Sequence, residues 1–272
     1  MIQALRYEWL RITTLRSTWW ITLGTIVIAS GLTFLVSMGM RLGSADEIEG
    51  SLSEDESREI VEMMMTQFSN FDPMFYLAAY VIAILGVLGW GHEYRHGMIR
   101  ATLTALPQRW TVWAAKHLVV GVWVAVVIVV TCLLSLLFAV LWFSGLDVDF
   151  DISAMLAAIG RRVVYAVLLT WLVMSLTLLV RHQTFALVAL YLWPLGIENL
   201  IKGFAVLPFF RDHYETTRFL PFNAGGRIMQ RHPEGETVFG DPLNAWGGFV
   251  VFGVFTAVLM VAALALLQKR DA

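Results

Sequence analysis

Charged side chains are scarce in this chain. Asp, Glu, Lys and Arg make up 15% of its 272 residues, hydrophobic residues make up 58%, and the mean hydropathy is +0.70. A soluble domain carries about a quarter charged residues, so this composition excludes an ordinary soluble fold. Cysteine is almost absent as well. Cys132 is the only one, has no disulfide partner in the chain, and lies in apolar surroundings typical of a small packing residue.

A phosphate-binding loop is also missing. Such a loop ends in Gly-Lys-Ser/Thr, but the three lysines of this sequence are followed by His117, Gly203 and Arg270. No Ser-His-Asp arrangement or carboxylate dyad stands out, and basic residues form no patch for nucleic acid beyond the inner loops. We therefore expect a chain that is not an enzyme, that binds neither cofactor, metal nor nucleic acid, and that takes its energy from another polypeptide.

What the chain has in abundance is long apolar sequence. Six runs contain no charged side chain and no histidine: 17–40, 73–91, 118–146, 163–180, 183–197 and 242–268. A helix needs roughly 20 apolar residues to cross a hydrocarbon layer of ~30 Å, whereas a barrel strand alternates over about 10 residues. The sequence therefore predicts a single all-α integral membrane domain over residues 1–272. Its six transmembrane helices are expected at about 18–40, 73–91, 114–143, 155–180, 184–202 and 243–267.

The distribution of charge orients these helices. With a cytoplasmic N-terminus, the inner segments carry ten basic and three acidic residues, and the outer segments carry nine basic and eighteen acidic ones. Basic residues concentrate around the first span and in the loop 92–116, as the positive-inside rule requires. Both termini are then cytoplasmic and the loops 41–72 and 203–242 extracellular. Arg161 and Arg162 fit poorly near the outer surface, where they snorkel or pair with the preceding aspartates.

Residues 1–17 do not resemble a signal peptide, because three arginines and a glutamate are spread through them and no small-residue cleavage site follows. We assign Leu5, Trp9, Ile12 and Arg16 to an amphipathic helix lying in the inner membrane interface. The alternative is a cytoplasmic extension of the first span.

The two outer loops carry weaker signals. In 41–72, Ser53 and Glu56 resemble a capping box and predict a short amphipathic helix. In 203–242, prolines and a pair of glycines break regular structure. Because the segment is too long for a simple turn, we expect short helices there that cap the outer end of a pathway.

One ionisable pair lies deep in the predicted fifth span. Glu198 and Lys202 are four residues apart, so a continuous helix would place them on one face as an ion pair. They are candidates for a transport pathway, and the alternative is a position at the outer interface.

The loop after the second span satisfies a metalloprotease pattern. His92-Glu93-Tyr94-Arg95-His96 reads H-E-x-x-H, in which two imidazoles bind zinc and the glutamate activates a water. Gly91 and Gly97 bracket the motif where a zinc helix is continuous, and no third ligand follows at a known spacing. A membrane-embedded zinc protease is therefore kept as an alternative hypothesis.

The same loop predicts a mechanical element. Residues 98–106 can form a short helix ended by Pro107, with Ile99, Leu103 and Leu106 on one side and Arg100 on another. Such a helix can dock in a groove of a soluble partner and transmit its motion. The alternative is a solvated connector.

Several segments together resemble the permease subunits of ABC transporters of the type-2 exporter class, especially the short bacterial ones. The likeness covers nearly the whole chain and rests on the segments 5–9, 14–20, 93–100, 103–107 and 268–272. It implies an interfacial connecting helix at 1–17, six spans, and a cytoplasmic coupling loop at 92–112. The implied coupling residues are Glu93, Arg95, Gly97, Ile99, Arg100, Leu103 and Leu106.

The resemblance also implies partners and location. Two ATP-binding subunits would hold ATP and Mg²⁺, and a second permease copy or a paralogue would complete the pathway in the bacterial plasma membrane, in contact with lipid. Hydrophobic or amphipathic cargo such as antibiotics, peptides or lipids is the class expectation, which suits a role in antibiotic resistance. An ATP-independent channel or scaffold is the third hypothesis.

Overall fold

The computed structural model describes residues 1–51, 72–105, 108–143, 152–205, 207, 211–229 and 243–269. Throughout this part of the chain the regular elements are helices, and it contains no strand. In chain order they are α1 Ile2–Thr14, α2 Arg16–Ser51, α4 Asp72–Arg95, α5 Ile99–Ala105, α6 Arg109–Phe143, α7 Ile152–Val180, α8 Gln183–Leu192, the π-helical η1 Trp193–Glu198, α9 Asn199–Ala205, the 3-10 helix η2 Arg211–Phe219, α10 Pro221–Arg227 and α11 Ala245–Lys269.

Within the described residues, six helical stretches are long and apolar enough to span a membrane. The all-helical prediction is confirmed, and these stretches fit a multi-pass membrane protein. They are Arg16–Gly39, Leu77–Arg95, Arg109–Trp142, Met155–Val180, Gln183–Ala205 and Ala245–Lys269. Each contains most of one predicted apolar run. In a bilayer the backbone polar groups must be satisfied within the segment, so continuous apolar sequence leaves the helix as the available solution.

Several boundaries differ from the predicted ones. α2 continues to Ser51, so the predicted outer loop 41–72 begins as helix. The capping box expected at Ser53 and Glu56 lies outside the described residues. α6 begins at Arg109, five residues earlier than expected, and the Arg109 side chain donates to the carbonyl of Leu267.

Short helices do occur in the predicted outer loop 203–242. η2 and α10 lie there within the described residues. α10 carries Gly225 and Gly226 in its interior, and Pro221 stands at its first position, where a missing N–H costs little.

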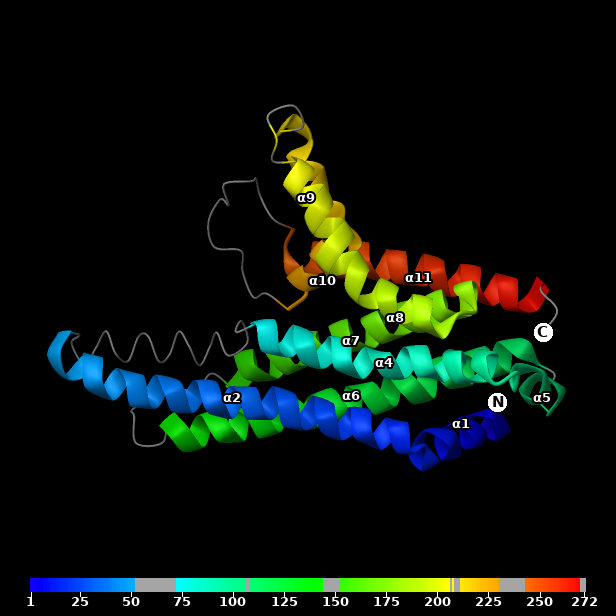
Figure 1. Ribbon diagram of the computed structural model, residues 1–272, viewed down its shortest axis with the longest axis horizontal. Coiled ribbons are helices and arrows are strands. Elements are labelled where there is room, and N and C mark those ends of the chain that lie inside the picture. Colours follow the sequence, from blue (N-terminus) through cyan, green and yellow to red (C-terminus); the bar gives the residue numbers. More distant parts are fainter. Residues whose placement is uncertain are drawn as a thin grey trace.

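The long helices α2, α4, α6 and α7 run side by side (Figure 1). α4 is the most enclosed of the candidate spans. Of the residues in its 18-residue apolar stretch, 61% are buried, whereas the share is 17% in the fifth candidate span and 22% in the sixth. Ile82, Ala83 and Val87 of α4 are fully buried among its neighbours. The start of α1, the short helix α5 and the last turns of α11 lie at one end of the bundle, called here the α5 end (Figure 1).

Small residues bring α4 close to α7. A Cβ added to Gly86 would lie 2.7 Å from the carbonyl oxygen of Thr170 and 3.0 Å from Met174 Cγ. Close backbone approach at small residues is a common way for helices to associate in membranes, where apolar burial gives little driving force. The α4–α7 contact therefore depends on the absence of a side chain at Gly86.

The fifth candidate span changes its helical form halfway. α8 gives way to the π-helical turn η1, which carries Pro194 near its start, before the α-helix resumes as α9. Proline removes a backbone donor, and π-turns are sites of bending. Figure 1 shows the α9 half leaning away from the bundle of long helices.

Arg162 lies inside the protein instead of reaching the surface. It is buried in α7, and its Nη1 atom lies 4.0 Å from the sulfur of Cys132 in α6. The aspartates proposed as partners for Arg161 and Arg162, at positions 147, 149 and 151, are outside the described residues. Cys132 is itself buried, as its apolar surroundings predicted.

Candidate functional site

α1 is a separate helix packed on the side of the bundle. Its last residue is followed by Leu15 in an extended conformation (φ −74°, ψ 122°), which breaks the chain before α2 begins at Arg16. This break argues against a simple extension of the first span. Ile12 is buried and Leu5 is partly buried against the core, whereas Arg16 is exposed.

The buried stripe of α1 differs slightly from the predicted one. It consists of Ala4, Glu8 and Ile12, which follow one another at four-residue intervals. Trp9 is 46% exposed and lies edge-on to Trp123 of α6, with ring centroids 5.9 Å apart. α1 therefore turns a carboxylate towards the bundle on a face that is otherwise apolar.

The partner of Glu8 is a buried lysine of α6. Lys116 Nζ lies 2.7 Å from Glu8 Oε1 and 2.5 Å from Glu93 Oε1, so one ammonium joins two carboxylates. Arg11 Nη1 adds a second cation, 2.5 Å from Glu93 Oε1 and 3.2 Å from Glu8 Oε2. These four residues, Glu8, Arg11, Glu93 and Lys116, are called here the ion-pair cluster. Their formal charges sum to zero.

The cluster is almost sealed from solvent. Lys116 is fully buried, Glu93 is 2% exposed and Glu8 is 4% exposed. Its cations have further contacts: Lys116 Nζ lies 4.8 Å from the centroid of the Trp90 ring, and Arg11 Nη2 donates to the Gly89 carbonyl at 2.5 Å. Buried charges are tolerated only when paired and hydrogen-bonded, so the cluster holds α1, α4 and α6 in one arrangement.

A tight turn leads from the cluster into α5. Gly97 has φ +64°, its N–H donates to the carbonyl of Tyr94, and the N–H of Met98 donates to the carbonyl of Glu93 at 2.9 Å. This pair of bonds around a left-handed glycine is the Schellman motif that ends many helices. The backbone of Glu93 thus closes α4 while its side chain joins the ion-pair cluster.

α5 has an attached side and an exposed side. Ile99 is buried and Leu103 is partly buried against the core, which fastens the helix to the bundle. Arg95, Gly97 and Arg100 are exposed. Leu106, another predicted coupling residue, lies outside the described residues. Among the predicted coupling residues, Glu93 and Ile99 are therefore buried where α5 joins the bundle, whereas Arg95 and Arg100 lie at the surface.

The histidines of the H-E-x-x-H pattern do not converge with Glu93 on a metal site. The rings of His92 and His96 lie 6.3 Å apart, and His96 belongs to the turn that follows α4. The Glu93 carboxylate is instead turned into the ion-pair cluster. Within the described part of the chain, no group of three or more His, Cys, Asp or Glu side chains is placed to hold a metal ion.

Glu198 has a different partner from the predicted one. Its two carboxylate oxygens accept the backbone N–H groups of Phe222 and Asn223, each at 2.8 Å. Those groups are the free donors at the start of α10. Helical spacing made an ion pair with Lys202 possible, but the structure shows no direct ion pair between these two described residues, although their charges interact at longer range. Both oxygens of Glu198 are taken by a helix start that lies 24 and 25 residues further along the chain.

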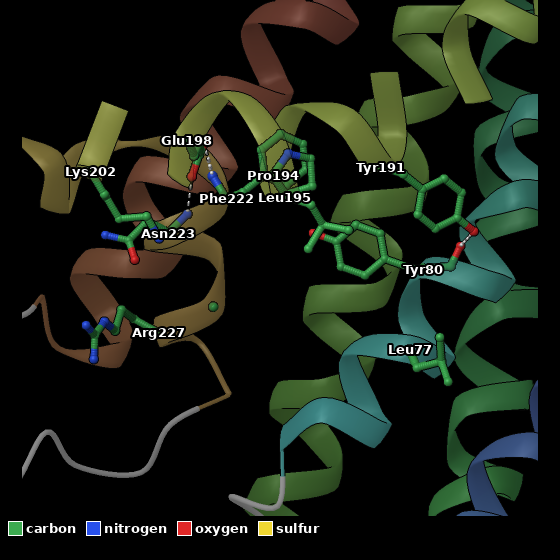
Figure 2. Close-up of a pocket in the computed structure, with 11 residues that line it drawn as sticks. Leu77, Tyr80, Tyr191, Pro194, Leu195, Glu198, Lys202, Phe222, Asn223 and Arg227 are labelled. Atoms are coloured by element: carbon green, nitrogen blue, oxygen red, sulfur yellow. Dashed lines mark hydrogen bonds between the residues drawn. The ribbon is translucent and has the colours of Figure 1, made fainter. Parts of the chain in front are cut away.

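A cavity of about 460 Å³ lies beside Glu198. Its walls come from α4, α8, η1, α9 and α10, and the lining residues are Leu77, Tyr80, Tyr191, Pro194, Leu195, Glu198, Lys202, Phe222, Asn223, Gly226 and Arg227. Figure 2 shows Lys202, Asn223 and Arg227 on one side of it and Tyr80 with Leu77 on the other. The Tyr191 hydroxyl donates to the Tyr80 carbonyl at 3.4 Å and ties α8 to α4. This space is called here the outer pocket, after the predicted outer loop 203–242 that contributes α10 to its walls.

α4 connects the two places. The outer pocket meets α4 at Leu77, sixteen residues before Glu93. At about 1.5 Å per residue the separation along the helix is about 24 Å. The ion-pair cluster at the α5 end and the outer pocket are thus connected by one continuous helix, α4.

Sequence reasoning identified Glu93, Glu198 and Lys202 but missed Glu8, Arg11 and Lys116 as a group. A signal for them was present. Glu8 interrupts the apolar stripe of α1, and Lys116 lies inside the predicted third span, where a charge needs a partner.

One comparison with known families gives a match. The family model described as "Protein of unknown function (DUF2705)" matches residues 24–272, so the chain belongs to this family. No curated protein matches it.

Proposed function

We propose that this member of the DUF2705 family is the membrane-spanning permease subunit of an ATP-driven ABC exporter in the bacterial plasma membrane. The ion-pair cluster is the observation that carries the proposal. It fixes α1 and the end of α4 to α6 immediately before the turn into α5. A helix that receives force from a soluble motor must be rigidly attached to the spans that it moves, and α5 has that attachment.

The proposed mechanism is mechanical. A separate ATPase subunit binds the exposed side of α5, around Arg95 and Arg100, and shifts it during ATP binding and hydrolysis. The Schellman turn at Gly97 and the buried Ile99 pass the movement to α4. Because α4 is packed against α2, α6, α7 and α8, its displacement changes the packing of the whole bundle. ATP and Mg²⁺ reside on the partner, and this chain supplies the pathway.

The charge at the α5 end favours a cytoplasmic location. Arg6, Arg95, Arg100 and Lys269 lie on α1, α4, α5 and α11 at that end and are exposed. Basic residues remain preferentially on the cytoplasmic side of a membrane. α1, with Trp9 and Leu10 exposed, then lies along the inner interface.

Thiol labelling tests this orientation. Cys132 is buried, so single cysteines introduced at exposed positions give specific signals. We expect Glu215→Cys, in η2, to react with a membrane-impermeant maleimide in whole cells, and Thr104→Cys, in α5, to react only after the membrane is opened. The opposite pattern would place α5 outside and overturn the proposal.

Copurification tests the partner. We expect a neighbouring reading frame to encode a P-loop ATPase, and we expect the chain to purify together with that ATPase when the two are coproduced. Arg100→Glu reverses a charge on the exposed side of α5 and is expected to weaken the association at least tenfold. Lys269→Glu, the same reversal on α11 at the same end, is the matched control and should leave it intact.

The two alternatives predict other results. If no ATPase is retained by the wild-type chain, an ATP-independent channel or scaffold is favoured. If the purified chain holds stoichiometric zinc and cleaves peptides, and Glu93→Gln abolishes cleavage while zinc remains, the protease hypothesis replaces the permease. The engagement of Glu93 in the ion-pair cluster favours the permease between these two.

We propose that the cargo is hydrophobic or amphipathic, as expected for type-2 exporters. If the cargo is an antibiotic, the protein contributes to antibiotic resistance. Translocation requires a second permease copy or a paralogue beside the first. The sparsely buried fifth and sixth candidate spans, at 17% and 22%, leave apolar surface for that partner and for lipid.

A further inference from the structure

The outer pocket exists because the fifth candidate span is bent. Pro194 and Leu195 belong to the π-helical turn η1, after which α9 leans away from the bundle (Figure 1). The space that opens between η1 and α4 is closed on its far side by α10, which is held there by Glu198 through the amides of Phe222 and Asn223. Five helical elements therefore build the pocket, which makes it more than a surface irregularity.

Glu198 and Lys202, two charged residues that line the pocket, differ in their hydrogen bonding. Glu198 is 1% exposed and its two oxygens accept two backbone amides, so its negative charge is already stabilised. Lys202 lies one helical turn further on and lines the pocket with no hydrogen bond or ion pair to another described residue. Arg227 also lines the pocket and has contacts of its own, so Lys202 is the cation on which a ligand contact is argued.

The remaining walls are apolar or aromatic. Leu77 and Tyr80 of α4 lie on the side of the pocket opposite Lys202 and Arg227, as Figure 2 shows, and Phe222 and Leu195 complete the apolar lining. A cavity of about 460 Å³ has the size of a small-molecule site, for which about 300–1,000 Å³ is typical. A ligand with an apolar chain and an anionic group would match the pocket, because its chain would lie against the apolar wall and its charge against the cationic wall.

We propose that the outer pocket binds an anionic amphiphile, with its phosphate or carboxylate group at Lys202 and its apolar part along Leu77, Tyr80 and Phe222. Lys202 is then the residue that distinguishes anionic from neutral or cationic ligands. The site itself is inferred from the pocket, and the identification of its ligand as exported cargo rests on the proposed function.

Binding to the isolated chain tests the site without any ATPase. The protein is purified in dodecyl maltoside, and the binding of dodecyl phosphate is measured by native mass spectrometry and by thermal stabilisation. We expect one bound molecule per chain and a raised melting temperature. Lys202→Gln is expected to weaken this binding about tenfold, as the loss of one charge-assisted contact implies. Lys269→Gln, a lysine change outside the pocket, is the matched control.

Two further ligands distinguish the sources of the anion. Inorganic phosphate that competes equally well would assign the site to a free anion and overturn the amphiphile proposal. Phosphatidylglycerol that competes while phosphatidylcholine does not would support a lipid as the natural ligand. Dodecyl trimethylammonium binding as tightly as dodecyl phosphate, or unchanged binding in Lys202→Gln, would also overturn the proposal.

A second variant tests the pocket independently, in case Lys202→Gln does not fold. Leu195 lines the pocket but is 69% exposed, so Leu195→Trp adds bulk to the lining without disturbing buried packing. It is expected to reduce dodecyl phosphate binding while the melting temperature of the free protein stays within a few degrees. Because no ATPase enters these measurements, failure of the pocket proposal leaves the permease proposal standing, and the reverse also holds.

Discussion

Lys116 and Glu93 form an ion pair of 2.5 Å in which the lysine is fully buried and the glutamate is 2% exposed. Such a pair stabilises a fold only weakly compared with an apolar contact of the same size, because both charges must leave water. The pair contributes instead to the specificity of the fold. Once α1, α4 and α6 are assembled, removing one partner leaves the other charge buried without compensation. The pair therefore specifies one arrangement of the helices that carry α5.

Lys116→Met tests this dependence. The substitution leaves Glu8 and Glu93 facing each other with only Arg11 between them, and removing one partner of a buried pair costs about 3–5 kcal/mol. We expect a melting temperature in detergent lower by several degrees and the loss of ATPase coupling. Lys269→Met, at an exposed lysine, should change neither. An unchanged melting temperature of Lys116→Met would show that the cluster does not hold the helices.

Gly97→Ala tests the turn into α5. Gly97 has φ +64°, a conformation in which a Cβ costs about 1–2 kcal/mol. We expect weaker partner ATPase stimulation together with a small loss of stability, measured on the copurified complex and by thermal unfolding.

Asparagine tolerates the left-handed conformation better, so Gly97→Asn should recover part of the stimulation. Gly24→Ala is the control, because Gly24 is helical and has open space around its Cβ position. Equal effects at positions 97 and 24 would contradict the assigned role of the turn.

Gly86→Ala tests the close contact between α4 and α7. The new methyl group would lie 2.7 Å from the carbonyl oxygen of Thr170, so the helices must separate. Overpacking of this kind costs about 1–3 kcal/mol. A lowered melting temperature is expected for Gly86→Ala but not for Gly31→Ala, whose Cβ position has nothing within 4 Å. Equal melting temperatures for the two variants would mean that α4 and α7 pack less closely than described.

Glu198→Ala tests the attachment of α10. The N–H groups of Phe222 and Asn223 lose their acceptor, and the loss of a helix cap costs about 0.5–2 kcal/mol. Hydrogen exchange within residues 221–229 should accelerate several-fold, while exchange in α4 stays as it is. Glu215→Ala, at an exposed glutamate of η2, serves as the control. Slow exchange in both variants would remove Glu198 as the residue that fixes α10.

The sequence by itself determined the helical membrane architecture. Long apolar runs without charge admit no other solution in a bilayer, and each run is read from neighbouring residues alone. The existence of short helices at 2–14 and 99–105 was also within reach, because Leu5, Trp9 and Ile12, or Ile99 and Leu103, repeat at helical spacing. Resemblance to a transporter class gave these helices roles that stay predictions.

Only the tertiary structure decided which charges meet. Lys116 and Glu8 are 108 residues apart in the chain, and Arg11 and Glu93 are 82 apart, so no local periodicity connects them. Glu198 illustrates the same limit: its neighbour Lys202 is the partner that helical spacing predicts, yet the start of α10 offers two aligned amides and takes both oxygens. A charge in a membrane-embedded bundle pairs with whatever donor or acceptor the packing brings to it, and packing is a property of the whole fold.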